Sequence, residues 1–152
     1  MMGIEWKNYL WADNHTADIA SVESLEADLC IKFPKDYLEV ATIHQGKVPN
    51  PNQINVGERI TSVGVLFLIT PDNDYKGSTI KSNVMFIEGD VPQGIVPIVG
   101  SGGGSVFALD FRKSSDTPSI VFVDSDKEGD DAITFLSDSF SGFLSLLRDD
   151  LA

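Results

Sequence analysis

The sequence is short of the residues on which many enzymes and secreted proteins depend. It has one cysteine, Cys30, and two histidines, His15 and His44, in 152 residues. A single cysteine excludes an internal disulfide, so nothing in the composition requires an oxidising compartment. Cys30 lies between Leu29 and Ile31, and we expect it to be a small core residue rather than a reactive thiolate.

Long apolar segments are also absent. The longest unbroken apolar run covers residues 65–69, whereas a helix that crosses a bilayer needs roughly 20 apolar residues. The first seven residues, Met-Met-Gly-Ile-Glu-Trp-Lys, lack the apolar stretch of a signal peptide. We therefore expect a cytoplasmic protein.

Positive charge is scarce. The chain has 11 basic residues against 23 acidic ones, which gives a formal net charge of -12. Nucleic acids and anionic membranes would be repelled, so we exclude both as direct partners. A basic protein is a compatible partner, although solubility alone accounts for the acidity equally well.

No motif for catalysis or for a cofactor is present. The glycine-rich segment 100–104 fails the dinucleotide pattern, because the sixth position is Ser105. It fails the P-loop pattern, because no lysine follows Gly104, and the segment leads into a predicted strand rather than a helix. No Gly-x-Ser-x-Gly elbow occurs. We expect no cofactor and no catalytic residues.

One segment has the spacing of a metal site. Asp124, Asp126, Glu128 and Gly129 match the first half of a calcium loop. The twelfth position, which should hold a bidentate glutamate, is Phe135, and the flanking segments are predicted strands. We expect a solvated turn and no metal, and the spacing leaves weak ion binding by residues 124–129 open.

The predicted fold centres on two apolar strands, 95–99 and 105–111, which the glycine-rich loop joins. Helical spacing, caps and breakers predict the other elements. Helices are expected over 4–11, 17–29, 34–45 (ended by Gly46) and 78–86; strands over 54–56, 61–69, 120–123 and 133–136; and a loop over 48–52.

The closing helix has the clearest periodicity. Phe140, Phe143, Leu144, Leu147 and Leu151 share one stripe, and a cap at Ser137 or Asp138 is expected. Helices come first, strands follow in succession, and a helix ends the chain. This order predicts an α+β fold, with a single domain over 1–152 and a largely antiparallel sheet covered by helices.

Several motifs together resemble the SUKH superfamily, whose members are related to fungal cell-wall-assembly regulators. The segment Glu23–Tyr37 carries a glutamate-bearing helix, a Phe-Pro step and a tyrosine. Further matches are Pro97-Ile98 before a glycine-rich turn, a strand over 106–110, and Ser139-Phe140 followed by Phe143-Leu144. The resemblance covers about residues 18–147, and the sequence departs from the pattern at 44–47, where one glycine remains.

The resemblance implies an α+β fold with a mixed sheet, and it implies a function. Many bacterial members are immunity proteins, each of which neutralises the toxin encoded beside it, often a nuclease. The family is not known for a shared catalytic apparatus. We therefore expect a non-enzymatic immunity protein that covers the basic active surface of a cognate toxin. The alternatives are a non-catalytic regulatory scaffold that binds cellular proteins and, in a different class, a hydrolase or ligand binder with carboxylates in a cleft.

Acidic residues concentrate in the last third of the chain. Between Asp110 and Asp150 there are ten acidic and four basic residues. A negative face of this kind speeds the encounter with a cationic partner, although loops are often polar simply because they are exposed. The candidate partner-binding residues are Asp124, Asp126, Glu128, Asp130 and Asp131, with Asp72 and Asp74 as a second patch.

Overall fold

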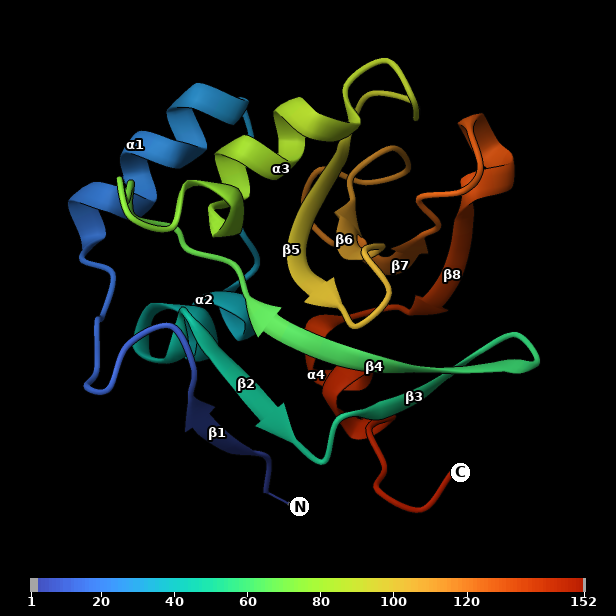
Figure 1. Ribbon diagram of the computed structural model, residues 1–152. Helices are drawn as coiled ribbons and strands as arrows, with labels where there is room; N and C mark the ends of the chain where they lie inside the picture. The colour runs from blue at the N-terminus through green and yellow to red at the C-terminus, as the bar shows by residue number, and fades with distance from the viewer. Residues whose placement is uncertain (1–2, 152) are drawn as a thin grey trace.

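The computed structural model describes residues 3–151, and it contains two β-sheets (Figure 1). A small sheet pairs β1 (Glu5–Asn8) with β2 (Lys47–Asn50). In the large sheet each strand lies beside its neighbour in sequence and runs antiparallel to it. Its strands are β3 (Gln53–Val56), β4 (Arg59–Leu66), β5 (Ile95–Ser101), β6 (Val106–Asp110), β7 (Ser119–Val123) and β8 (Ile133–Ser137).

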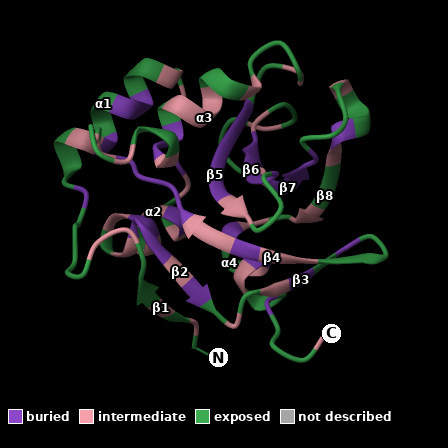
Figure 2. Cartoon of the chain, viewed as in Figure 1, coloured by how far each residue is buried: buried purple, intermediate pink, exposed green. Residues whose placement is uncertain are grey.

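The two strands predicted as the centre of the sheet do lie there. β5 and β6 occupy the middle of the strand order, and all five residues of β6 are buried, as the purple ribbon of Figure 2 shows. Gly104 takes a φ of +89° in the connecting loop, a conformation that costs glycine little. The prediction of an α+β fold with a largely antiparallel sheet is confirmed. Within residues 3–151, parallel pairing is confined to the isolated bridges Leu68–Thr79 and Glu88–Val91.

Residues 3–151 contain four α-helices: α1 (Ile19–Leu29), α2 (Lys35–His44), α3 (Ile80–Ile87) and α4 (Phe140–Ser145). Helix α3 packs against β5, α4 packs against β7 and β8, and α2 packs against α4. Two 3-10 turns occupy Lys76–Ser78 and Gly129–Ala132. Asp18 caps α1, and its carboxylate accepts a hydrogen bond from the Ser21 amide at 2.8 Å. None of the helices within residues 3–151 combines the length and the hydropathy needed to cross a membrane.

A chain of aromatic rings ties the helices to the sheet. Tyr37 of α2 packs against Phe33 and, edge-on at 5.3 Å between ring centroids, against Phe140 of α4. Phe143 of α4 then lies 5.3 Å from Phe107 at the centre of β6. Edge-to-face and tilted contacts of this kind add to the stability gained from burial. The aromatic residues of the motifs that carried the family resemblance, Phe33, Tyr37, Phe140 and Phe143, are therefore core residues.

The helix predicted over residues 4–11 and the loop predicted over 48–52 are wrong. Residues 5–8 form β1, which pairs with β2 in the register Glu5–Asn50 to Asn8–Lys47. Gly46, with a φ of +79°, turns the chain from α2 into β2. The apolar spacing near the N-terminus is compatible with a helix, but strand pairing with a distant segment determines the structure.

The last helix is shorter than predicted. α4 ends at Ser145, and its cap is Ser139, whose hydroxyl accepts a hydrogen bond from the Gly142 amide. Beyond the helix, Arg148 exchanges two backbone hydrogen bonds with Gln53 at the start of β3. This bridge to the sheet replaces further helical turns.

Cys30 is exposed, so its prediction as a core residue is wrong. It ends α1 in the left-handed conformation, with a φ of 58°, and its amide donates to the carbonyl of Glu26. A residue at such a helix end points away from the apolar stripe, which is why the hydrophobic neighbours of Cys30 in sequence were misleading.

Tyr37 generates a prediction about stability. Its hydroxyl is buried and has no hydrogen-bond partner among residues 3–151, and burial raises the pKa of this phenol. A buried hydroxyl without a partner is destabilising, so Tyr37→Phe should leave the free energy of unfolding unchanged or raise it by up to about 1 kcal/mol. Urea denaturation measures this difference.

Tyr75→Phe is the matched control for that substitution. The Tyr75 hydroxyl donates to the carbonyl of Leu10 at 2.7 Å, so its removal should lower the free energy of unfolding by about 0.5–1.5 kcal/mol. Equal losses for the two variants would contradict the assignment for Tyr37.

Candidate functional site

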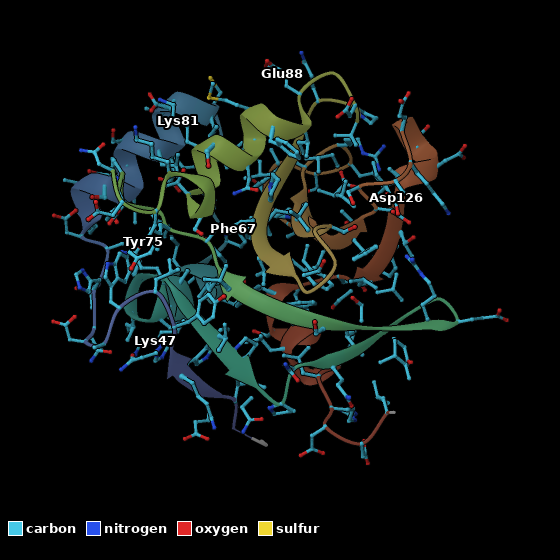
Figure 3. The ribbon with its side chains drawn as sticks, viewed as in Figure 1. Lys47, Phe67, Tyr75, Lys81, Glu88 and Asp126 are labelled. Atoms are coloured by element: carbon cyan, nitrogen blue, oxygen red, sulfur yellow. The ribbon has the colours of Figure 1, made fainter. Side chains whose placement is uncertain are left out.

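Two loops come together at one end of the molecule and carry a group of exposed acidic side chains. Residues 124–131 connect β7 to β8, and residues 88–94 connect α3 to β5. The amide of Gly129 donates to the carbonyl of Asp90 at 2.7 Å and joins the loops. Figure 3 labels Glu88 and Asp126, one on each loop. We call this region the acidic end; its carboxylates belong to Glu88, Asp90, Asp126, Glu128, Asp130 and Asp131.

Asp124 anchors the loop instead of facing solvent. It is 8% exposed, and its amide donates to the carbonyl of Ala132 at 2.8 Å. One carboxylate oxygen accepts from the Asp126 amide at 2.9 Å, and the other accepts from Arg59 at 3.3 Å. The guanidinium of Arg59 also lies over the ring of Phe122, 5.7 Å from its centroid. Asp124 therefore closes the loop and ties it to the hairpin of β3 and β4.

Asp130 is held in place by Arg112. This arginine forms a bidentate pair with the buried carboxylate of Asp110, at 3.0 and 2.8 Å, and reaches Asp130 at 3.0 Å with its remaining amino group. Burial on its own raises the pKa of Asp110, but the hydrogen bonds and charge of Arg112 prevail and lower that pKa. Hydrogen bonding to Asp110 in turn raises the pKa of Arg112.

The other predicted carboxylates of this loop face solvent. Asp126, Glu128 and Asp131 are exposed, and within residues 3–151 their carboxylates form no hydrogen bond or ion pair. Lys127 is the basic residue of the loop. Three carboxylates on an anchored loop are thus available to a cationic partner.

The second predicted patch is separate from the acidic end. Asp72 accepts hydrogen bonds from the amides of Asp74 and Tyr75, at 2.8 and 2.9 Å, so it shapes the turn after β4. Asp74 is exposed. In Figure 3 Tyr75 and Asp126 lie on opposite sides of the view. The structure does not bring the two patches together.

Sequence reasoning missed two members of the acidic end. Glu88 and Asp90 flank Gly89, just after the helix predicted over 78–86 and outside every predicted site. They lie about 40 residues before the other acidic loop, and only the pairing of β5 with β6 and of β6 with β7 brings the segments side by side. Two acidic residues on either side of a glycine can be recognised in the sequence, but the local sequence does not show which distant segment lies beside them.

The described residues offer no ready metal site. Among residues 3–151 no three histidine, cysteine, aspartate or glutamate side chains are grouped so that they could hold an ion. The first residue of the calcium-like spacing, Asp124, gives its carboxylate to Arg59 and to the Asp126 amide. The carboxylate of Asp124 is therefore already engaged within the protein, whereas those of Asp126, Glu128 and Asp131 face solvent.

A comparison with protein-family models gives one match. The model of the SMI1 / KNR4 family (SUKH-1) covers residues 16–146, which is most of the chain. No curated protein matches the sequence. The matched segment includes both loops of the acidic end and every strand of the large sheet.

Arg112→Gln should destabilise the protein in a pH-dependent way. The substitution leaves the buried Asp110 carboxylate without its cation, at a cost of about 1–3 kcal/mol near pH 7. The folded-state pKa of Asp110 is lowered, so its contribution to stability is present above the unfolded pKa of about 3.9 and is lost as the pH falls through the folded value. The difference between wild type and variant should therefore shrink below about pH 4.

Asp130→Asn is the control for this measurement. It removes the exposed partner of Arg112 and keeps the pair with Asp110, so it should cost less than about 0.5 kcal/mol. Urea denaturation between pH 3 and 7 gives both values. A constant difference for Arg112→Gln over that range would show that the ion pair is not the cause.

Proposed function

The chain belongs to the SMI1/KNR4 family (SUKH-1), and from this membership we propose that it is an immunity protein that binds and neutralises a cognate toxin. The observation that carries the proposal is the anchored acidic loop with its exposed carboxylates at Asp126, Glu128 and Asp131. A net charge of -12 suits a basic partner, and a nuclease has a basic substrate-binding surface.

The mechanism is occlusion without catalysis. Carboxylates of the acidic end take the place that nucleic-acid phosphates would occupy on the toxin, so the toxin cannot reach its substrate. Opposite charges steer the two proteins together and raise the association rate, and salt screens this attraction. The protein acts in the cytoplasm and uses no cofactor, and neither nucleic acid nor a membrane binds it directly.

Two arginine–aspartate contacts favour binding by keeping the loop in place before the partner arrives. Asp124 bonds to Arg59 and Arg112 bonds to Asp130, so less conformational freedom is lost when the complex forms. In this proposal Asp126, Glu128, Asp130 and Asp131 touch the toxin, Asp124 supports them, and Asp72 with Asp74 forms a separate, second contact.

Co-expression tests the function. The large open reading frame beside this gene should kill or arrest cells when it is expressed alone, and co-expression of this chain should restore survival. An empty vector is the control. A toxic reading frame that this chain does not neutralise would contradict the proposal, and a neighbourhood without a toxic frame would favour a regulatory scaffold.

Charge reversal tests the surface. A triple variant with Asp126→Lys, Glu128→Lys and Asp131→Lys should associate with the purified toxin at least about tenfold more slowly at low salt. The salt dependence of its association rate should also be weaker. Stopped-flow fluorescence measures the rates, and cell survival should fall in parallel.

The matched control reverses the same number of charges at exposed positions outside the acidic end. It carries Glu5→Lys, Glu39→Lys and Asp149→Lys, all on exposed residues, and it has the same net charge as the test variant. It should associate several times faster than the test variant, because the location of the charges matters as well as their sum. Equal rates for the two variants would rule out the acidic end as the docking face.

A further inference from the structure

Helix α3 exposes two large apolar side chains that its packing does not use. Ile80 is fully buried, and Val84 and Ile87 pack against the core beneath the helix. Met85 and Phe86 are 66% and 75% exposed. Successive residues of a helix are about 100° apart around its axis. Met85 and Phe86 therefore both lie on the solvent-facing side of α3 and point in different directions. A lone exposed apolar residue is ordinary, but an adjacent Met-Phe pair on one short helix indicates a contact surface.

Each of these side chains borders a cleft. Met85 lines a cleft of about 620 Å³ between α1 and α3, which Leu25, Ile69 and Pro71 also line. Phe86 lines a smaller cleft of about 180 Å³ between α3 and the loop that follows β7. Helix α3 is therefore a ridge between two hollows. We call Met85 and Phe86 the α3 ridge.

The surroundings of the α3 ridge are negative. The C-terminal end of a helix carries a partial negative charge, which basic side chains usually offset. The last turn of α3 has no basic residue, and the exposed Glu88 and Asp90 follow it. On the other side of the helix Lys81 is paired with Asp28 at 3.1 Å (Figure 3). Lys127 lines the smaller cleft together with Asp90 and Asp124.

We propose that the α3 ridge is the apolar centre of the surface that binds the toxin. The occupant is a segment of the toxin that presents an apolar side chain flanked by lysine or arginine. The apolar side chain packs against Phe86 and Met85, and the basic side chains meet Glu88, Asp90 and the carboxylates of the acidic end. This inference rests on the proposed function and specifies the chemistry of the partner.

Interface anatomy and charge support this occupant. Stable interfaces combine a desolvated centre, in which aromatic residues and methionine are enriched, with a polar rim. A second copy of this chain is a poorer occupant, because each copy carries a net charge of -12 and contact across the ridge would bring Glu88 and Asp90 of both copies together.

The test uses the full chain and the purified toxin from the neighbouring reading frame. Phe86→Ser combined with Met85→Ser should raise the Kd by about tenfold or more, mainly through faster dissociation. The salt dependence of association should not change, because no charge is altered. Both side chains are exposed, so the thermal midpoint of the variant should match that of wild type. Phe135→Ser is the control: Phe135 is 59% exposed on β8, and its replacement should leave the Kd within about twofold of wild type.

Amide hydrogen exchange gives a second readout that needs no variant. Binding of the toxin should protect residues 80–90. If wild type binds the toxin while the double variant binds equally well and residues 80–90 gain no protection, the inference is wrong and the proposed function stands. If wild type neither binds the toxin nor protects cells, both fail. A dimer of the free chain that Phe86→Ser dissociates would assign the ridge to a second copy and overturn the inference.

Discussion

Burial of β6 on both of its faces is the constraint on which the rest of the structure depends. All of its residues, from Val106 to Asp110, are buried, and the three in the middle are inaccessible to solvent. Four are apolar and stabilise the core simply by leaving water. The fifth is a carboxylate, whose burial is unfavourable unless a cation and hydrogen bonds compensate for it. Arg112 supplies both, so the end of this strand determines where the arginine lies.

Through Arg112, the contacts of the buried strand continue to the loops at the surface. Arg112 reaches Asp130 with its free amino group, and the Gly129 amide next to it bonds to the loop that carries Asp90. Asp124 fixes the other end of the same loop through Arg59. Core packing and surface charge are therefore parts of one connected network. The carboxylates that face solvent therefore lie on loops whose backbone is fixed by contacts with the core.

The sequence predicts those parts of this arrangement that depend on near neighbours. The central hairpin could be predicted because its two apolar strands and glycine turn are contiguous. The strand at Glu5–Asn8 could not, because its partner is about 40 residues away, and α4 is short because Arg148 bonds to Gln53. For the candidate site, acidic spacing singled out the loop after β7 as a proposed contact surface. It could not separate Asp124, which is buried and bonded, from Asp126, which is exposed, since that difference arises from the hairpin of β3 and β4.

The succession of strands in the large sheet has a consequence for how such a protein changes over time. Because each strand pairs with the one beside it in the chain, an insertion in the segment after α3 or after β7 lengthens a connection without altering any pairing register. Residues of the acidic end can thus be substituted, or further residues inserted there, without a change in the central hairpin of β5 and β6. Under the proposed function, a scaffold with this property can adapt to changes in the surface of its toxin through changes in its loops alone.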